Sequence, residues 1–555
     1  YTFLFFSKRR VRVMERISEH YAVWREKAVE YKAELEAMSE DDKKEAFYKD
    51  LEFGTAGLRG ILGAGTNRLN IYTIGKVTKG LAMYLLAHKK SGIKVAVSYD
   101  SRNCSEEFAR YAAAVLAACG IKAYITDKLQ PTPYLSYMVR SLKCDAGVMI
   151  TASHNPAKFN GYKVYGADGC QVTDNAAEEI FGFIQNTDTF SVKPADFDSA
   201  VADGTIVFSD VTRAYLDEVY KRSVGSARDV AIVYTPLNGT GTSIVPQMFR
   251  ERGFDKVTVV PEQALPAGNL PTTPYPNPEK AEALKLAIDL AKKTGADVVI
   301  GTDPDADRIG AAVKTGDGYR LISGNEMGVL LIDYIFSHSK ALPKKPVVVK
   351  TIVTTDLAAR VAESYGAEVR EVLTGFKYIG EVIKKLEAKG EGDRFVFGYE
   401  ESYGYLSGSY VRDKDAVVAS MLVAEMTADY LKEGKTLADV LDGIYAKYGK
   451  YYHRTVSFTY EGAAGAQKMS EVLSGVRNDP PAAIDGSKVA ESVDYLTQDK
   501  FDLPKSNVLS FKAEDGSKLI VRPSGTEPLI KVYITAACGG EKRIDAILEQ
   551  VKKFM

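Results

Sequence analysis

A strand–helix–strand pattern occurs three times along the chain, and it constrains the fold more than any other feature. The three cycles cover residues 94–151, 230–301 and 347–398, and each contains short apolar, β-branched segments separated by helical segments. Such spacing indicates right-handed βαβ units, which build largely parallel sheets. The cycles share this pattern without obvious sequence similarity, which suggests ancient repetition of one module.

The pattern changes near Tyr451, where several strand-like segments follow one another before a final helix over 540–555. Strands in succession followed by a helix predict a small α+β domain. We therefore expect an α/β protein with three related mixed-sheet domains and a smaller C-terminal α+β domain around a central cleft. The expected ranges are 14–210, 211–325, 326–450 and 451–555.

The length and charge fit this organisation. The chain has 555 residues, which predicts about three to five domains because single cores stop growing near ~250–300 residues. With 72 Lys and Arg against 73 Asp and Glu, it lacks the basic excess of nucleic-acid coats and membrane-surface proteins. The longest membrane-span candidate, Met327–Phe336, is short and contains Asp333.

The terminus and the cysteines carry two further expectations. Residues 1–13 place an apolar run before basic residues, the reverse of a secretory signal, so we interpret them as an extension. The chain has five cysteines and no C-x-x-C motif. An odd number without metal-site spacing indicates buried thiols in a reducing, cytoplasmic compartment rather than a disulfide or zinc framework.

Polar motifs follow the apolar strands, where open α/β sheets bind ligands. The first motif, Thr151–Pro156, places Ser153 directly after a strand as a candidate nucleophile. A simple Ser/Asn turn is the competing interpretation. His154 is adjacent to Ser153, which disfavours a hydrolase relay, and no G-x-S-x-G elbow is present.

The second motif spaces Asp303, Asp305 and Asp307 at alternate positions, where their oxygens can converge on one hard cation. Arg308 and Lys314 occupy the positions where an EF-hand needs Gly and Glu, which excludes that motif. Three carboxylates around a divalent ion leave a net charge of −1, so basic groups must help to bind an anion. Arg308 is the adjacent candidate.

Four other loops are less specific. The loop 398–404 suits sugar hydroxyls but equally an ordinary polar loop, and 522–528 suits an anion or a plain turn. The loop 54–60, which carries Arg59, is similarly ambiguous. The segment 239–241 is a lone G-x-G, which we interpret as a helix-entry turn.

As an ordered set, TASHNP, NGYKVY, GTDPDADR, GYEESYG and RPSGTEP resemble the α-D-phosphohexomutase superfamily over residues 40–555. The chain is most similar to the phosphoglucomutase branch, which includes bacterial glucose enzymes and a mammalian phosphopentomutase. The resemblance implies an intramolecular phosphotransferase that interconverts glucose 1-phosphate and glucose 6-phosphate. It also implies a phosphoserine enzyme and a glucose 1,6-bisphosphate intermediate, which serves as activator too.

The resemblance implies a role for each matching residue. Ser153 would carry the phosphoryl group, and one of its phosphate oxygens would join Asp303, Asp305 and Asp307 around one Mg²⁺. His154, Lys163 and Arg59 match active-site positions, the role of His154 being open. The expected substrate-binding residues are Arg308, Lys377, Glu400, Ser402, Arg522, Ser524, Gly525 and Thr526.

Two departures leave the sugar open. Tyr399 stands before Glu400 where many glucose enzymes have glycine, and the phosphate loop ends in Glu527-Pro528. A phosphopentomutase or phosphomannomutase with the same machinery is the nearest alternative. A non-catalytic sugar-phosphate binder and a phosphatase are the others. We expect sugar phosphates as the only partners, with no nucleic acid or membrane, a monomer or weak homodimer, and a mobile fourth domain.

Overall fold

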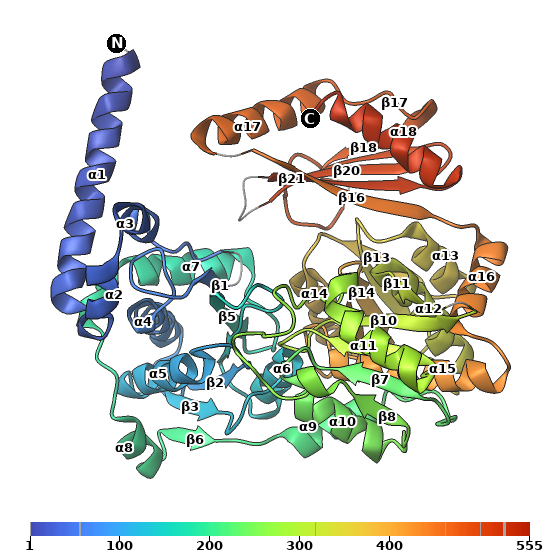
Figure 1. The fold of residues 1–555 in the computed structure, drawn as a ribbon, viewed down its shortest axis with the longest axis horizontal. Coiled ribbons are helices and arrows are strands. Elements are labelled where there is room, and N and C mark those ends of the chain that lie inside the picture. The colour runs from blue at the N-terminus through green and yellow to red at the C-terminus, as the bar shows by residue number, and fades with distance from the viewer. Residues whose placement is uncertain (1, 55–56, 317, 461, 500, 525–528) are drawn as a thin grey trace.

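The computed structural model describes residues 2–54, 57–316, 318–460, 462–499, 501–524 and 529–555. Four sheets form the body, and a long N-terminal helix projects from it (Figure 1). Each expected domain range holds one sheet, which confirms the predicted fold class. The boundary expected after residue 325 lies inside the first turn of helix α12, which begins at Gly324.

The first sheet has the order β1-β5-β4-β2-β3-β6. Strand β2 pairs in parallel with β3 and β4, whereas β5 runs antiparallel to both β4 and β1. The sheet is therefore mixed. Its elements are β1 Gly57–Ile61, α4 Ile71–His88, β2 Lys94–Tyr99, α5 Ser105–Ala118, β3 Lys122–Ile125, α6 Thr132–Ser141, β4 Ala146–Ile150, β5 Phe159–Gly166, α7 Asp174–Gln185, α8 Phe197–Ala202, β6 Ile206–Phe208 and α9 Thr212–Tyr220.

Three helices precede this sheet: α1 Thr2–Lys27, α2 Lys32–Ala37 and α3 Glu40–Phe47. Trp24 and Phe47 are buried between these helices, with Tyr21 and Tyr31 packed against the same cluster. Helix α1 runs without a break through residues 2–13, the predicted extension.

The second sheet has the order β11-β10-β9-β7-β8 and the third β13-β12-β14-β15. The second comprises β7 Ile232–Thr235, α10 Gly241–Glu251, β8 Val257–Val259, α11 Ala281–Thr294, β9 Val298–Thr302, β10 Ile309–Thr315 and β11 Gly318–Ile322. The third comprises α12 Gly324–His338, β12 Val347–Thr351, α13 Asp356–Ser364, β13 Glu368–Val372, α14 Phe376–Ala388, β14 Phe395–Glu400, β15 Gly404–Ser407, α15 Ala416–Lys432 and α16 Leu437–Tyr448.

One continuous apolar core joins the first three sheets. It includes Tyr134 from the first, Ile300 from the second and the apolar residues of α12 and α15. The apolar run 327–336 lies inside α12 and is packed in this core. In the described part of the chain, no helix is long and apolar enough to cross a membrane.

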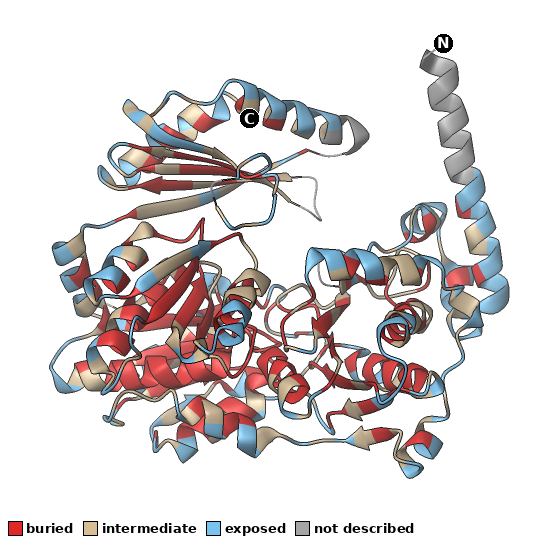
Figure 2. Cartoon of the chain, turned by 180° about the vertical axis from the view of Figure 1, so that it is seen from behind, coloured by how far each residue is buried: buried red, intermediate tan, exposed pale blue. Residues whose placement is uncertain are grey.

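The fourth sheet, β16-β21-β20-β19-β18-β17, is antiparallel throughout and has its own core. Figure 2 shows its buried strands beneath helices with exposed outer faces. A small cluster, which includes Ile352 and Ile520, packs the third sheet against it. Its elements are β16 Tyr452–Thr459, α17 Gly462–Asn478, β17 Ala483–Ile484, β18 Ser487–Asp494, β19 Leu509–Ala513, β20 Lys518–Pro523, β21 Leu529–Ala536 and α18 Gly540–Lys552.

All five cysteines are free. The expectation of buried thiols is wrong for three of them: Cys104 and Cys538 are exposed and Cys119 is half-buried. Cys119 stands at the C-terminal end of α5, where the apolar run leaves the core. Cys144 and Cys170 are buried as expected.

Candidate active site

The motifs after the apolar strands meet in one cleft of about 1790 Å³, which residues of all four sheets line. The loops that follow β4, β9 and β14 all contribute to this lining, as expected where ligands bind at the carboxyl ends of strands. Gly525 and Thr526 lie outside the described residues. The predicted residues that line the cleft are Arg59, Ser153, His154, Lys163, Asp307, Arg308, Lys377, Glu400, Ser402, Arg522 and Ser524.

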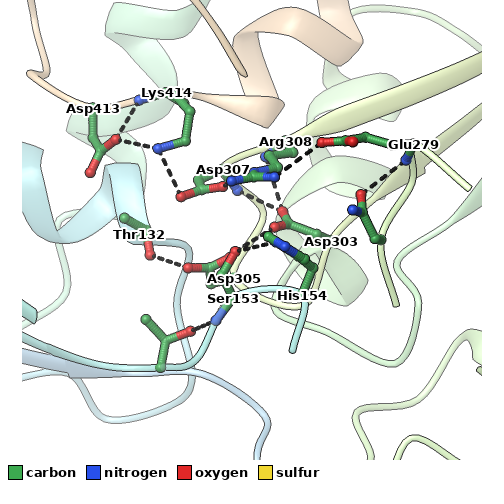
Figure 3. A network of polar contacts seen from close by, with 12 residues as sticks. Thr132, Ser153, His154, Glu279, Asp303, Asp305, Asp307, Arg308, Asp413 and Lys414 are labelled. Carbon is green, nitrogen blue, oxygen red and sulfur yellow. Dashed lines mark hydrogen bonds and ion pairs between the residues drawn. The ribbon is translucent and has the colours of Figure 1, made fainter. Parts of the chain in front are cut away.

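Ser153 follows strand β4 and is almost fully buried. Its backbone is left-handed, with φ of 52°, a conformation that costs most residues about 1–2 kcal/mol. Its N–H donates to Thr151 Oγ1 at 2.8 Å, and its Oγ donates to Asp303 Oδ2 at 2.9 Å (Figure 3). The hydroxyl of one sheet is thus aimed at the acidic loop of another.

His154 places Nδ1 3.1 Å from Ser153 Oγ. Burial, reinforced by the positive charges of Arg308 and Arg59, holds the His154 pKa well below its ordinary value. The ring is therefore neutral near pH 7 and can accept or donate a hydrogen bond at this oxygen. Adjacency in sequence does not keep this ring from the hydroxyl.

The three aspartates on the loop between β9 and β10 are buried, and their ligand atoms lie within 4.8 Å of one another. Asp303 Oδ1 accepts the backbone N–H groups of Asp307 and Arg308 at 3.1 and 3.0 Å. Among the described residues, Oδ1 of Asp305 and Oδ1 of Asp307 have no hydrogen-bond partner. Unpaired buried carboxylate oxygens that converge in this way fit a hard divalent cation.

Three cations surround these carboxylates. Lys163 Nζ lies 2.9 Å from Asp305, Lys414 Nζ lies 3.2 Å from Asp307, and Arg308 Nε lies 3.7 Å from Asp307. Burial acts to raise the Asp305 pKa, but the charge and hydrogen bond of Lys163, together with the charge of Lys414, outweigh it and lower this pKa below its usual value. Burial and the charge of Asp305 raise the Asp303 pKa. The motif pointed to Arg308 and the family resemblance to Lys163, and the structure adds Lys414 as a further cation that offsets the acidic loop.

Lys414 is the main residue that the sequence analysis missed. It is buried beside Asp413, whose Oδ1 lies 2.9 Å from Lys414 Nζ and whose Oδ2 accepts from Tyr165 at 2.7 Å. The available signal was the charged run 412–415 directly before the apolar helix α15. Charged side chains that are buried beside an apolar helix need partners of opposite charge, and a carboxylate cluster supplies them for a lysine.

Two other segments hold the acidic loop in place. Thr132, at the start of α6, donates to Asp305 from both its N–H and its Oγ1, each at 2.9 Å. A Cβ at Gly239 would come within 2.3 Å of Pro304, so only glycine fits there. Helix α10 begins at Gly241, which confirms the predicted helix-entry turn and shows that it also supports this loop.

Glu400 ends strand β14, is 5% exposed, and accepts the N–H of Gly375 at 2.8 Å. Burial raises its pKa. Tyr399 points the opposite way: it is fully buried, and its ring packs in the core beside Tyr405. Because alternate residues of a strand face opposite sides, Tyr399 does not line the cleft. Its side chain is therefore not among those that a sugar bound in the cleft would meet.

The wall formed by the fourth domain is less tightly held. Arg522 Nη1 donates to Tyr533 at 3.4 Å, a contact within its own sheet. Lys377, across from it on α14, is paired with Asp174 at 2.5 Å. Both cations line the cleft where a second phosphate could bind.

Comparisons with known proteins agree with this arrangement. The chain matches phosphoglucomutase/phosphomannomutase alpha/beta/alpha domain I over residues 50–190, domain II over 213–316, domain III over 323–448, and the C-terminal domain over 476–553. It is 38% identical to a phosphoglucomutase of Staphylococcus saprophyticus, covering 93% of this chain and 95% of that one. The match to a Staphylococcus aureus phosphoglucomutase is 37% identical and covers 91% and 92%.

Solved structures support the fold. A phosphomannomutase-like protein of Thermus thermophilus superposes with a TM-score of 0.70 at 22% identity, covering 91% of this chain and 99% of that one. Parafusin of Paramecium, described as a phosphoglucomutase in an open form, gives 0.70 at 17% identity, covering 91% and 95%.

Proposed function

The chain belongs to the phosphoglucomutase/phosphomannomutase family, and we propose that it interconverts glucose 1-phosphate and glucose 6-phosphate. The observation that carries the proposal is the Ser153 hydroxyl, 2.9 Å from an aspartate of a buried acidic loop that cations from three sheets surround. A nucleophile, a metal-type carboxylate cluster and balancing cations are the parts that phosphoryl transfer needs.

Ser153 is the residue that carries the phosphoryl group. The free hydroxyl of the bound sugar attacks phosphorus, the bond from phosphorus to Ser153 Oγ breaks, and the hydroxyl proton is transferred to Oγ. The sugar then bears two phosphates. After the bisphosphate turns around, Ser153 Oγ attacks the phosphorus of the other phosphate, the bond from that phosphorus to the sugar oxygen breaks, and the proton of Oγ is transferred to the sugar oxygen. The sugar leaves as a monophosphate, and the phosphoserine form of the enzyme returns. His154 Nδ1, 3.1 Å from Oγ, is positioned to exchange this proton.

Asp303, Asp305 and Asp307 would hold one Mg²⁺ with an oxygen of the phosphoserine, and the ion would offset charge on the transferring group. Lys163, Lys414 and Arg308 surround the same position, so they clamp the reacting phosphate. Arg59 lines the cleft on the side of the first sheet and contacts the same anion.

Sugar binding falls to the remaining walls of the cleft. Glu400 accepts hydrogen bonds from sugar hydroxyls, and Ser402 both accepts from them and donates to them. Lys377 faces the substrate. Arg522, Ser524, Gly525 and Thr526 hold the phosphate that is not being transferred. One such site must accept both orientations of the bisphosphate, which favours movement of the fourth domain. Closure also keeps water from the phosphoserine.

The proposal extends to the setting of the enzyme. Glucose 1,6-bisphosphate primes Ser153, and the enzyme acts as a monomer or weak homodimer in the cytoplasm. The five free cysteines favour a reducing compartment. Light scattering during size-exclusion chromatography measures the oligomeric state.

A substrate panel tests the sugar. We expect kcat/KM for glucose 1-phosphate to exceed the values for mannose 1-phosphate and ribose 1-phosphate by about tenfold or more, a difference of ~1.4 kcal/mol in transition-state binding. A tenfold preference for the pentose would instead identify a phosphopentomutase. Phosphate release without bisphosphate turnover would identify a phosphatase.

Ser153→Ala tests the mechanism. Intact-mass analysis of the wild type should show a species heavier by about 80 Da, one phosphoryl group, that the variant lacks. The variant should lose mutase activity by at least about 10⁴-fold, because no covalent intermediate can form. Full activity in Ser153→Ala would contradict the proposed chemistry and leave only a binding role for this serine.

A further inference from the structure

A buried arginine lies behind the loop that carries Ser153. Arg102 follows strand β2, its side chain is fully buried, and it does not line the cleft. Its guanidinium donates to four backbone carbonyls of one short segment: Ser153 and Asn155 from Nη2, Pro156 from Nη1 at 3.0 Å, and Phe159 from Nη1 at 3.2 Å. Four acceptors of residues 153–159 therefore converge on one side chain.

A second buried group holds the guanidinium. The Asp100 carboxylate lies 3.4 Å from Arg102 Nε, and its Oδ1 accepts from Ser105 Oγ at 2.7 Å and from the Arg102 N–H at 2.9 Å. Both side chains are fully buried. Burying an ion pair costs free energy, which hydrogen bonds offset. The four carbonyls accept from both Nη groups, whereas Arg102 Nε and Asp100 Oδ2 have no hydrogen-bond partner among the described residues and meet only as an ion pair at 3.4 Å. The planar guanidinium of Arg102 is thus held by the carbonyls on one side and by the Asp100 carboxylate on the other.

This contact determines how Ser153 is held. The N–H of Ser153 donates to Thr151, and its C=O accepts from Arg102, so both of its peptide groups are fixed. Its left-handed backbone, with φ of 52°, is unfavourable without such restraint. The backbone of Ser153 sets the direction of Oγ toward Asp303. Misplacing a reacting atom by about 1 Å can slow a reaction about 10²-fold.

We propose that Arg102 is a positioning residue for phosphoryl transfer, which holds Ser153 Oγ in line with the reacting phosphate without touching the substrate. The proposal rests on the assignment of Ser153 as the phosphoryl carrier. It requires a planar fork with several donors, since one ammonium group cannot reach the four carbonyls in the same geometry. Asp100 acts through Arg102 by fixing that fork.

Arg102→Lys tests the proposal, with Arg228→Lys as the matched control. Arg228 also pairs with a buried carboxylate, Glu425 at 2.9 Å, and donates to backbone carbonyls, but these belong to Arg252 and Ala227 and not to the Ser153 loop. We expect Arg102→Lys to lower kcat for glucose 1-phosphate about 100-fold while KM changes less than threefold. Arg228→Lys should show a comparable fall in Tm and keep kcat within twofold.

A second measurement follows Ser153 directly. Phosphorylation of the dephosphorylated enzyme by glucose 1,6-bisphosphate, quenched and weighed by intact mass, should slow in Arg102→Lys as much as kcat does. If kcat of Arg102→Lys stays within threefold of the wild type, or if both variants lose kcat in proportion to Tm, Arg102 has only a structural role.

Asp100→Asn keeps the proposal testable if Arg102→Lys does not fold. It retains the guanidinium and its four acceptors but removes the opposing charge. We expect a loss of kcat of about tenfold at nearly constant KM, and unchanged kcat would contradict the proposal. Failure of the proposed function would look different: Ser153→Ala would keep full activity, or the wild type would prefer a different sugar.

Discussion

The two ends of the cleft are built differently. At the reacting end, formed by Ser153, Asp303, Asp305, Asp307 and Lys163, side chains from different sheets contact one another at 2.9 Å. At the far end, Arg522 contacts Tyr533 of its own sheet at 3.4 Å, and among the described residues it forms no hydrogen bond or ion pair with another domain. The reacting end is held by three sheets that share one core, whereas the far end belongs to a domain with a separate core.

The difference fits the two tasks of a mutase. The transferring phosphate needs fixed charges at fixed places, so its surroundings are assembled across domain boundaries. The other phosphate must be held in either orientation of the sugar, so its surroundings sit on a domain with few outside contacts. Substitutions at the two ends should therefore affect different kinetic constants.

Asp305→Asn should have the largest effect. It removes a charge from the buried cluster that Lys163 and Thr132 contact, so we expect kcat to fall about 10³-fold and the affinity for Mg²⁺ to fall with it. The rise in Tm that Mg²⁺ gives the wild type should shrink in the variant. Asp289→Asn, an exposed residue of α11, is the control and should leave kcat and the Mg²⁺ effect unchanged.

Arg522→Lys should have a smaller effect, and mainly on KM. Lysine keeps the charge but loses the planar fork, so we expect KM for glucose 1-phosphate to rise about 10–30-fold while kcat changes only a few-fold. Arg454→Lys, whose exposed partners lie on α18, is the matched control within the same domain. A loss confined to kcat would show that the far end is as rigidly organised as the reacting end.

Asp356→Asn should loosen the far end. The Asp356 carboxylate lies 3.1 Å from Lys512 and 3.6 Å from Lys518 of the fourth domain, and 3.2 Å from Lys350 of the third. We expect KM to rise about threefold, and its dependence on salt to weaken because the screened pairs are gone. KM measured at low and high KCl tests this, with Asp229→Asn, an exposed pair, as control.

Glu401→Gln should change stability with little effect on chemistry. Burial and the charge of Glu400 raise the Glu401 pKa to about 7. The folded state then holds a proton that the unfolded state has lost above its ordinary pKa, so the wild type loses stability as pH rises from about 4.5 to 7. The variant should be more stable than the wild type at pH 8, by up to about 3 kcal/mol, and the gain should vanish near pH 4. Urea unfolding at the two pH values measures it.

Local sequence determined much of the fold. Strands β12 and β13 lie within the third predicted cycle, residues 347–398, where valines recur between polar turns. The antiparallel β5 was not predicted as a strand, although it pairs with β4 and carries Lys163. Its glycine and aromatic residues do not alternate in the simple way that a half-buried strand does.

The chemistry of the site was predicted from residue types after strands, but its contacts were not. Thr132 and Asp305 are 173 positions apart, and only the docking of two sheets brings them together. Arg102 is a polar residue after a strand, but nothing in the sequence indicates that its partners are carbonyls of another loop. Tyr399 departs from the family pattern before Glu400, and strand alternation places its side chain on the opposite face, in the core.

The offsetting of the acidic loop by lysines has a consequence for how the chain matures. Domains generally fold as they emerge during synthesis, from the N-terminus onward. Lys163 is made before the three aspartates, but Lys414 is made more than a hundred residues after Asp307. Until that lysine arrives, the growing chain holds a carboxylate cluster with one of its counter-charges missing. The acidic cluster is therefore fully offset only late in translation, and a chain truncated before residue 414 should lack one of its counter-charges.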